Sequence, residues 1–541
     1  MAEQQDQTVF GIDLGTTYSC IAYVDQYGKA TVVQNSEGDQ LTPSVVLFDP
    51  GARVVGKEAK NAALQSPERV VSFVKRHMGE QGWRFEYEGT LYSPEEISSY
   101  ILKKVVKDAE ESLGRPITDV VITCPAYFGT AEREATAMAG KLAGLNVKTI
   151  INEPLAAALD YGMQQQRDQV VLVYDLGGGT FDVTMIAVKG GDISEIATGG
   201  NDQLGGKDWD EQVMRFLAAQ WQQAMGSEKN PLDDPLALED LRLKAENAKR
   251  SLTARTETSV AVVYDGQQAN VTLTREKFDA LTEYLLTQTI ALTRDLLEIA
   301  KSKGYDHVDQ ILLVGGSSRM PQVRDRVMRD LGIEPKMFDP DQSVAKGAAI
   351  YGLKVVIDSE YEQQKAGDPT RSESEIVGDI AIKYALPPAK VEDLMNTSPE
   401  TVSSHSLGVI AVNAQRQEII SNLVQANTRL PCESTRQYVT LDANQSEVLI
   451  RIIENNEMTD VADPALGRQI GEARLTGLPE RLPAGSPIEV TFTINEQQRL
   501  HMRARDLTGG AEIEATVELN NSLSDNERKI AEERVGVLAY A

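Results

Sequence analysis

The sequence contains few cysteines and histidines and no long apolar run. Its 541 residues include three cysteines, with no CxxC pair among them, and four histidines. Such sparse thiols and imidazoles argue against a disulfide framework and against a structural zinc site. Nowhere do about 18 apolar residues follow one another, and residues 1–10 contain neither the basic nor the apolar segment of a signal peptide. We therefore predict a reduced, soluble and cytoplasmic protein.

Positive charge is also scarce. The chain carries 54 Lys and Arg residues against 81 Asp and Glu residues, which gives a formal net charge of −27. A surface of this sign repels phosphate backbones and anionic lipid headgroups. We therefore predict that neither nucleic acid nor a membrane is a partner. With 41% hydrophobic residues the composition is that of an ordinary globular protein, and the length suffices for several structural units.

Residues 1–356 alternate strand-like and helix-like segments. β-rich runs, such as residues 8–13 and 170–175, alternate with amphipathic stretches such as residues 94–114, whose apolar spacing is helical. Alternating strands and helices are typical of an α/β fold. We therefore predict that residues 1–356 form an α/β domain.

The remaining third of the chain has a different composition and residue pattern. Residues 357–403 are polar and acidic and contain several prolines, which predicts a linker or insert. Residues 404–521 alternate apolar and polar side chains between turn-forming residues, which is typical of an antiparallel β-sandwich. In residues 522–541, Ser524 followed three positions later by Glu527 predicts the start of one short helix.

An internal repeat is the most informative feature. Residues 9–24 and 171–188 each read as strand, Asp-Leu-Gly, small residues, strand. The two matching copies predict two similar lobes that face one cleft, whereas two unrelated hairpins with glycine turns are the alternative. Asp13 and Asp175 end matching strands and could hold a hydrated Mg²⁺ between them, because Mg²⁺ needs few protein ligands. Asp182 adds a third carboxylate beside the second turn.

Both turns also suit a phosphate chain. Glycine and small hydroxyl residues let backbone N–H groups approach phosphate oxygens closely. One hairpin offers Gly15, Thr16 and Thr17, and the other offers Gly177, Gly178, Gly179 and Thr180. The sequence contains no GxxxxGK[ST] motif and no GxGxxG motif at the start of a helix. We therefore predict a phosphate clamp made of two hairpins that close from opposite sides.

A series of motifs carries a family resemblance. GIDLGTTYSC, TPSVV, CPAYF, INEPLAAAL, YDLGGGTFDV, LGGKDWD, AKRSL and VGGSSRMP follow one another in this order. Together they resemble the nucleotide-binding domain of the seventy-kilodalton heat-shock chaperones, the DnaK-type family, over nearly all of residues 8–356. Residues 404–520 resemble the family's peptide-binding sandwich more loosely.

The resemblance implies both a fold and an activity. The implied fold is a two-lobed, actin-like (ribonuclease-H-like) ATPase domain followed by an all-β antiparallel sandwich. The implied activity is that of an ATP-dependent chaperone, which hydrolyses ATP to ADP and uses the nucleotide state to bind and release extended hydrophobic segments of unfolded proteins. Mg²⁺ is the implied metal, with K⁺ as a further candidate. A J-domain co-chaperone and a nucleotide-exchange factor are the implied partners besides the unfolded clients.

The resemblance also assigns site residues. Lys75 matches the family's catalytic lysine, and Glu153 and Asp182 match acidic residues around the attacking water and the metal. The implied catalytic group is Lys75, Glu153, Asp182, Asp13, Asp175 and Thr180, with Asp13 and Asp175 as metal ligands. The implied nucleotide-binding residues are Gly15, Thr16, Thr17, Tyr18, Gly177, Gly178, Gly179, Thr180, Glu246, Lys249, Arg250, Thr253, Gly315, Gly316, Ser317, Arg319 and Asp341. Pro125 and Arg133 match the proline switch that couples the nucleotide state to the other domain.

The sequence departs from the family pattern at four places. Leu41 and Thr42 stand where the family has two threonines. The family's aliphatic interdomain linker is absent, and residues 376–386, which are apolar and β-prone, are expected to replace it by docking on the ATPase domain in one nucleotide state. Thr149 stands near the family's basic residue for the J-domain. Most of the helical lid is expected to be missing.

The family's peptide pocket can be carried over onto the sandwich. The matching residues are Val409, Val412, Tyr438, Leu441, Val448, Ile450 and Ile488. A sandwich core is the alternative interpretation for at least half of them, because a core needs alternating apolar residues anyway.

Two other functions stay open on the sequence alone. One is a nucleotide-binding co-chaperone, or an exchange-factor-like scaffold, with little coupled peptide cycling. The altered linker and the missing lid favour this function, whereas retention of the catalytic residues argues against it. The other is a small-molecule kinase or a filament-forming protein on the same fold. No substrate motif supports the kinase, and a β-sandwich is not expected of a filament protein.

Overall fold

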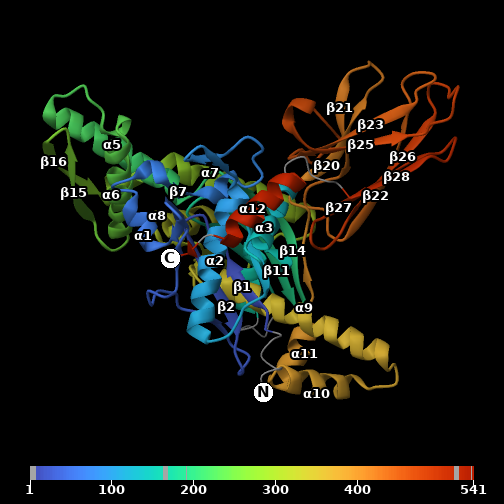
Figure 1. Cartoon of the computed structure of the whole chain (residues 1–541), viewed down its shortest axis with the longest axis horizontal. Helices are drawn as coiled ribbons and strands as arrows, with labels where there is room; N and C mark the ends of the chain where they lie inside the picture. The colour runs from blue at the N-terminus through green and yellow to red at the C-terminus, as the bar shows by residue number, and fades with distance from the viewer. Residues whose placement is uncertain (1–7, 163–167, 191, 517–522, 538, 541) are drawn as a thin grey trace.

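Figure 1 shows the computed structural model, which describes residues 8–162, 168–190, 192–516, 523–537 and 539–540. The first part of the chain builds a six-stranded sheet, here called the N-terminal sheet, in the order β11-β10-β1-β2-β3, with β4 paired to β2. Its strands are β1 (Phe10–Asp13), β2 (Tyr18–Val24), β3 (Ala30–Val32), β4 (Thr42–Pro43), β10 (Asp119–Cys124) and β11 (Asn146–Asn152). β1 is antiparallel to β2 and parallel to β10, as the alternating pattern of strands and helices predicts.

Helix α2 (Pro94–Leu113) illustrates how local sequence sets the ends of an element in this part of the chain. The Ser93 side chain accepts a bond from the backbone N–H of Glu96, Pro94 occupies the first turn, and Gly114 ends the helix in a left-handed conformation. Ile97 and Tyr100 then pack with strand residues of the N-terminal sheet in one apolar cluster. The neighbouring elements are α1 (Lys57–Ala62), the 3₁₀ helices η2 (Pro67–Arg69) and η3 (Val74–His77), α3 (Thr130–Leu142), β5 (Val45–Asp49), β6 (Ala52–Val55), β7 (Val70–Ser72), β8 (Phe85–Tyr87) and β9 (Thr90–Tyr92).

A second six-stranded sheet, here called the central sheet, has the order β18-β17-β12-β13-β14-β19. Its strands are β12 (Gln169–Leu176), β13 (Phe181–Lys189), β14 (Asp192–Asn201), β17 (Gln310–Val314), β18 (Lys336–Met337) and β19 (Pro399–Glu400). The sheet is accompanied by α5 (Gly206–Met225), η4 (Pro231–Asp233), α6 (Pro235–Ala254), α7 (Arg275–Ser302), η5 (Gly316–Arg319), α8 (Pro321–Leu331) and the hairpin β15 (Glu257–Tyr264) and β16 (Gln267–Thr274). β12 and β13 repeat the antiparallel pairing of β1 and β2, as the internal repeat predicts.

Two helices connect the N-terminal and central sheets. α4 (Glu153–Gly162) and α9 (Ser343–Gly367) share one apolar cluster with Val121 of the first sheet and Val173 of the second. The helices approach each other closely at Gly347, where a Cβ would come within 1.7 Å of the Ala156 carbonyl oxygen. A larger residue at this position would therefore push the two helices apart.

The predicted insert is helical. α9 runs without interruption through the predicted boundary at residues 356 and 357, and α10 (Glu373–Lys383) and α11 (Pro388–Asn396) fold back on it. The predicted β tendency of residues 376–386 is therefore wrong. Ser372 and Glu375 form a capping box at the start of α10, and the apolar residues that follow recur at helical spacing against α9.

The C-terminal part contains two antiparallel sheets, with strand orders β24-β21-β20-β23-β25 and β22-β26-β27-β28. The strands are β20 (Ser406–Val412), β21 (Glu418–Val424), β22 (Cys432–Val439), β23 (Glu447–Asn455), β24 (Val461–Ala462), β25 (Gly467–Thr476), β26 (Pro487–Ile494), β27 (Leu500–Asp506) and β28 (Glu512–Thr516), with η6 (Pro464–Leu466) before β25. Side chains of both sheets, such as Ile452 and Phe492, belong to one apolar cluster.

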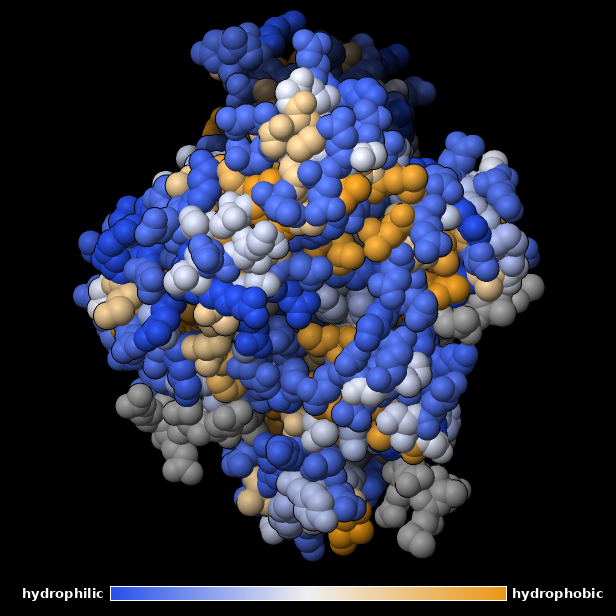
Figure 2. Space-filling model, turned by 90° about the vertical axis from the view of Figure 1, so that its left-hand side faces the viewer, coloured by the Kyte–Doolittle hydropathy of each residue, from blue (hydrophilic) through white to orange (hydrophobic). Residues whose placement is uncertain are grey.

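The last described helix returns to the first part of the chain. Ser524 and Glu527 make the reciprocal bonds of the predicted cap, and α12 (Asp525–Val537) follows. α12 lies beside α2 (Figure 1), where Lys103 donates to the Val535 carbonyl oxygen, and β29 (Ala539–Tyr540) then pairs with β6. The face in Figure 2 is mainly hydrophilic, with apolar side chains in separate patches. Among the described residues, no helix is both long and apolar enough to cross a bilayer.

Candidate functional site

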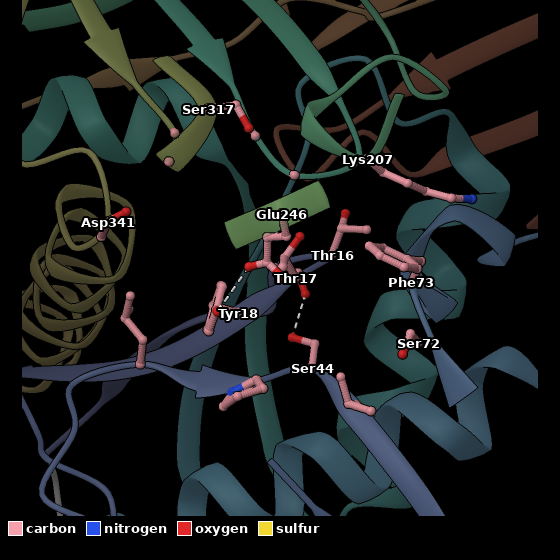
Figure 3. Close-up of a pocket in the computed structure, with 18 of the residues that line it drawn as sticks. Thr16, Thr17, Tyr18, Ser44, Ser72, Phe73, Lys207, Glu246, Ser317 and Asp341 are labelled. Atoms are coloured by element: carbon pink, nitrogen blue, oxygen red, sulfur yellow. Dashed lines mark hydrogen bonds between the residues drawn. The ribbon is translucent and has the colours of Figure 1, made fainter. Parts of the chain in front are cut away.

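A cavity of about 1070 Å³ lies between the elements of the two six-stranded sheets (Figure 3). The predicted site residues that line it are Asp13, Gly15, Thr16, Thr17, Tyr18, Lys75, Glu153, Asp175, Gly177, Gly178, Thr180, Glu246, Lys249, Arg250, Thr253, Gly315, Gly316, Ser317, Arg319 and Asp341. Two predicted residues, Gly179 and Asp182, do not line it. Residues that are far apart in the sequence therefore line one cavity.

The two Asp-Leu-Gly hairpins touch each other at this cavity. A Cβ on Gly178 would come within 1.8 Å of Thr17 Oγ1, and a Cβ on Gly179 would come within 2.4 Å of Thr16 Cγ2. The turn of the first hairpin is also fixed from outside, because Ser44 donates to the Gly15 carbonyl oxygen at 2.7 Å (Figure 3). Glycine is thus required in the second hairpin by the side chains of the first.

A buried ion pair lies at one end of the cavity. Lys75, on η3, donates from Nζ to Glu153 Oε1 at 2.5 Å, and both side chains are buried. Burial lowers the pKa of Lys75, but the carboxylates of Glu153 and Asp13 raise it more, so that the amine holds its proton. Glu153 stands at the first turn of α4, directly after β11.

Three aspartates surround this pair. Burial, followed by the nearby Glu153 carboxylate, raises the pKa of Asp13 to about 7 and that of Asp182 to about 8. The same two causes raise the pKa of Asp175 well above its usual range. Four acids thus face one lysine, and their raised pKa values mean that ionising all of them together is unfavourable unless a cation is bound beside them.

The carboxylate geometry fits Mg²⁺ better than a metal that needs a complete protein cage. Among the described residues, no three acidic, thiol or imidazole side chains converge closely enough to hold a metal by themselves. Mg²⁺ keeps several waters and takes one or two carboxylates together with substrate phosphates. Asp13 and Asp175, at the ends of β1 and β12, would hold it. Thr17 Oγ1 is buried there without a partner in the part of the chain that the structure describes, as expected of a polar group beside an absent ligand.

The opposite end of the cavity is built from α6 and the turn after β17. Glu246 accepts from Lys60 Nζ at 2.6 Å and from the Tyr18 hydroxyl at 3.4 Å, so that it joins α6 to the N-terminal part. Burial raises the pKa of Glu246, but Lys60 lowers it more, and the net direction is down. Arg319 forms an ion pair with Asp341 beside Gly316. Glycines and a guanidinium plane at this end suit a flat base.

Sequence reasoning missed Lys60, Phe73 and Lys207, which line the cavity, and Arg76, which lies beside it. Lys60 joins α1 to Glu246, and Arg76 binds the Gly179 carbonyl oxygen at 2.8 Å and Asp208 at 2.5 Å. Phe73 and Lys207 form part of the wall. Lys207 lies in the LGGKDWD motif, but no local motif marks Lys60 or Phe73, because their partners come from the opposite side of the cavity. For Arg76, the adjacency to Lys75 was an available signal.

The segment that leads into the C-terminal sheets docks on the central sheet. β19 pairs in parallel with β14, so that Pro399 faces Ile193. It is this polar segment, rather than residues 376–386, that lies at the sheet edge. Thr401 donates to the buried Glu195 carboxylate at 2.5 Å, and the backbone N–H of Val402 donates to the same oxygen at 3.3 Å.

The predicted switch residues reach the same carboxylate. Arg133 donates to the carbonyl oxygens of Phe128 and Ala126, and thereby fixes the turn that begins at Pro125. It also donates to Asn152 Oδ1 at 2.6 Å, and Asn152 donates onward to Glu195 at 2.9 Å. A continuous chain of hydrogen bonds therefore runs from the turn after β10 to Thr401.

The residues of the predicted peptide pocket divide into two groups. Val409, Ile450 and Ile488 belong to the buried apolar cluster between the C-terminal sheets, as the core interpretation predicts. The side chain of Leu441 is 54% exposed, and Val412, Tyr438 and Val448 are partly buried. Two further positions differ from the family pattern. At the first, Leu41 lines the cavity and the Thr42 hydroxyl accepts a hydrogen bond from Asn35. At the second, Thr149 is buried, and the adjacent Lys148 forms an ion pair with Asp119.

Comparison with known families agrees with this geometry. The model of the family described as Hsp70 protein matches residues 9–84, 80–361 and 392–535. The chain belongs to the Hsp70 family. Members of the Hsp70 family are in general ATP-dependent chaperones that bind ATP or ADP with Mg²⁺, unfolded polypeptides and co-chaperones. The matched ranges leave out residues 362–391, which contain the whole of α10.

Proposed function

We propose that this Hsp70-family chain hydrolyses ATP to ADP and uses its nucleotide state to bind and release extended hydrophobic segments of unfolded proteins. The observation that carries the proposal is the cavity that joins both Asp-Leu-Gly hairpins to the buried Lys75–Glu153 pair. Phosphoryl transfer depends mainly on positioning and on neutralising the charge of the phosphates. A protonated lysine held among carboxylates suits both tasks.

Each residue at the phosphate end has a defined part in this proposal. Asp13 and Asp175 would hold Mg²⁺, which would supply positive charge to the phosphate oxygens. Lys75 supplies a further positive charge, and Glu153 orients its ammonium group through the 2.5 Å bond. The close contact between Thr17 and Gly178 fixes the two hairpins against each other, which holds their backbone N–H groups in place for the phosphates.

We further propose that the N-terminal and central sheets are the two lobes of an actin-like ATPase domain within residues 1–356. The matching β1–β2 and β12–β13 hairpins support this assignment. The C-terminal sheets would then form a peptide-binding β-sandwich within residues 404–521, with Leu441 at its surface. The sandwich by itself should bind peptide with micromolar affinity and fast exchange. A cytoplasmic location, a J-domain co-chaperone and an exchange factor stay predictions.

The bonded chain through Arg133, Asn152 and Glu195 supports coupling between the two domains. It begins beside β10, whose end contributes to the phosphate side of the cavity, because Thr123 donates to Asp13 Oδ1 at 3.3 Å. It ends at Thr401, in the segment before the sandwich. A change at the nucleotide could therefore reach the sandwich through bonded groups.

Single-turnover ATP hydrolysis by Lys75→Ala tests the proposal. We expect the rate to fall by about 100-fold or more, because one charged group at the transition state is lost, while ADP affinity changes by only a few fold. Lys104→Ala is the matched control, since Lys104 is also buried and paired with a carboxylate, Asp108, but lies on α2 away from the cavity. Its rate should stay near that of the wild type.

Two outcomes would contradict the proposal. Equal hydrolysis rates in Lys75→Ala and the wild type would mean that Lys75 takes no part. A wild-type chain that binds ATP without hydrolysing it, with or without an unfolded client, would instead favour the scaffold function.

A further inference from the structure

Phe73 has an unusual backbone conformation next to the catalytic lysine. It joins β7 to η3 with φ 60° and ψ 24°, in the left-handed region. Bulky side chains avoid this region, and a residue held in it persists only where its surroundings require it. Among the described non-glycine residues with positive φ, Phe73 is the one aromatic residue. Its surroundings should therefore show what holds it.

The ring of Phe73 meets two cations from the other side of the cavity. Lys207 Nζ, from α5, lies 5.2 Å from the ring centroid, and the Arg242 guanidinium carbon, from α6, lies 6.0 Å from it. Figure 3 shows Phe73 and Lys207 close together in the cavity wall. Cations at such distances are attracted to the face of an aromatic ring. The ring thus links the turn after β7 to helices of the central sheet.

The same turn carries Lys75. The backbone N–H of Arg76 donates to the Phe73 carbonyl oxygen at 3.1 Å, which closes the turn, and Lys75 lies between these residues. From there its Nζ reaches Glu153. The ring and the lysine are therefore attached to one short 3₁₀ turn, so that a change in its backbone would move both.

We propose, on the basis of the proposed hydrolysis, that Phe73 is a positioning residue that holds Lys75 against Glu153 only while α5 and α6 close on the cavity. The cation contacts stabilise the strained turn. When α5 and α6 move away, the ring loses both cations, the turn relaxes and Lys75 leaves its position. Hydrolysis would then depend on closure of the cavity.

Other contacts across the cavity should allow variants of Phe73 to fold. Lys60 pairs with Glu246, and Arg76 pairs with Asp208, and neither pair involves the ring. Loss of the ring should therefore weaken closure without preventing it. The expected effects are moderate changes in rate rather than loss of nucleotide binding.

The experiment compares Phe73→Leu with Phe73→Tyr. The leucine variant keeps an apolar side chain but loses the cation contacts, whereas the tyrosine variant keeps them. For Phe73→Leu we expect single-turnover hydrolysis to fall by about 5-fold and release of a fluorescent ADP analogue to accelerate by about 3-fold, as expected for lost cation–π contacts. Phe73→Tyr should stay within about twofold of the wild type in both measurements.

Two further variants test the mechanism. Phe216→Leu is the matched control, because Lys277 Nζ lies 5.5 Å from the Phe216 ring on α5, away from Lys75. Its rates should not change. Arg242→Met should reproduce part of the Phe73→Leu effect, and the double variant should fall no further than Phe73→Leu alone, since both substitutions remove the same contact.

The proposal is overturned if Phe73→Leu and Phe73→Tyr behave alike, or if the effects of Phe73→Leu and Arg242→Met simply add. The ADP-release measurement does not need hydrolysis. If the wild type fails to hydrolyse ATP, the proposed function fails, and the release rates still decide whether Phe73 holds the cavity closed.

Discussion

Thr17 Oγ1 lies so close to Gly178 that a Cβ on the glycine would come within 1.8 Å of it. The two residues belong to different hairpins, one from β1–β2 and one from β12–β13. Their contact joins the two hairpins at the cavity. The Thr17 Cβ would also be only 2.9 Å away, so rotation of the threonine side chain cannot remove the whole clash.

Gly178→Ala should therefore hold the hairpins apart. We expect ADP affinity to fall by about 10-fold or more, because a shift of even a few tenths of an ångström disturbs closely packed groups. Isothermal titration calorimetry measures the affinity. Gly378→Ala, on α10, is the matched control, since a Cβ there meets nothing within 4 Å. Equal affinities in the two variants would show that the hairpin contact does not control nucleotide binding.

Thr401→Val should release the docked segment from the central sheet. The Thr401 hydroxyl donates to Glu195 and accepts from Asn152 at 3.2 Å and from Gln498 at 3.3 Å, so valine removes three bonds with little change in shape. A hydrogen bond to a charged group contributes about 1.5–3 kcal/mol. We therefore expect amide hydrogen exchange in residues 400–402 to accelerate by about 10-fold or more.

Ser398→Ala is the control for this prediction, because Ser398 is exposed and lies just before β19. Its exchange rates should match those of the wild type. The role of Glu195 as an anchor is excluded if Thr401→Val leaves exchange in residues 400–402 unchanged.

The two isoleucines of α10 offer a matched pair. Ile380 is fully buried against α9, whereas Ile382 is 71% exposed. Ile380→Asp places a charge in the apolar cluster and should destabilise the helical insert by about 4 kcal/mol or more. Ile382→Asp should change stability by less than about 0.5 kcal/mol.

Limited proteolysis within residues 368–396 measures the difference, with rapid cleavage expected in Ile380→Asp alone. Similar cleavage of both variants would contradict the packing of α10 on α9. Any loss of coupling between the domains in Ile380→Asp would reflect unfolding of the insert. The reason is that this segment packs as a helix and does not form an extended docking strand.

The sequence predicted those parts of the site that depend on local spacing. The Asp-Leu-Gly hairpins could be found because Asp13 and Asp175 end strands that repeat the same pattern. Lys60 and Phe73 could not be found in this way, because their partners, Glu246 and Lys207, come from distant helices. Such contacts are fixed by tertiary packing rather than by neighbouring residues.

The insert shows a different kind of failure. β-branched residues around Ile376 suggested an extended segment. The Ser372–Glu375 pair is the same capping signal as Ser524–Glu527, which did predict a helix. Weighing the cap and the helical spacing of the apolar residues above β propensity would have given the correct element.

Glu96 gives the chain a pH-dependent stability. Its side chain is 1% exposed, and its carboxylate accepts from the Tyr100 hydroxyl at 2.8 Å and lies 3.5 Å from Arg534 of α12. Burial raises the pKa of Glu96 from 4.5 to about 7, although Arg534, Tyr100 and Arg53 lower it. At pH values between 4.5 and about 7, Glu96 is therefore protonated in the folded chain and ionised in the unfolded chain.

This difference fixes the sign of the effect. The stabilisation is fully present below the unfolded pKa and is lost as the pH rises through about 7. The free energy of unfolding should therefore fall by up to about 1.4 kcal/mol per pH unit within this window. Glu96→Gln, which keeps an oxygen acceptor for Tyr100 without the charge, should remove this slope.

Thermal unfolding of the wild type and Glu96→Gln between pH 5 and pH 8 tests the expectation. The difference in melting temperature between them should change most steeply from about pH 5 to pH 7 and level off above. Burial also raises the pKa of the neighbouring Glu95. Part of the pH dependence of stability should therefore remain in both proteins. Glu111→Gln, at an exposed position of α2, is the control and should follow the wild type. Melting curves of Glu96→Gln that run parallel to those of the wild type at every pH would show that Glu96 does not titrate in this range.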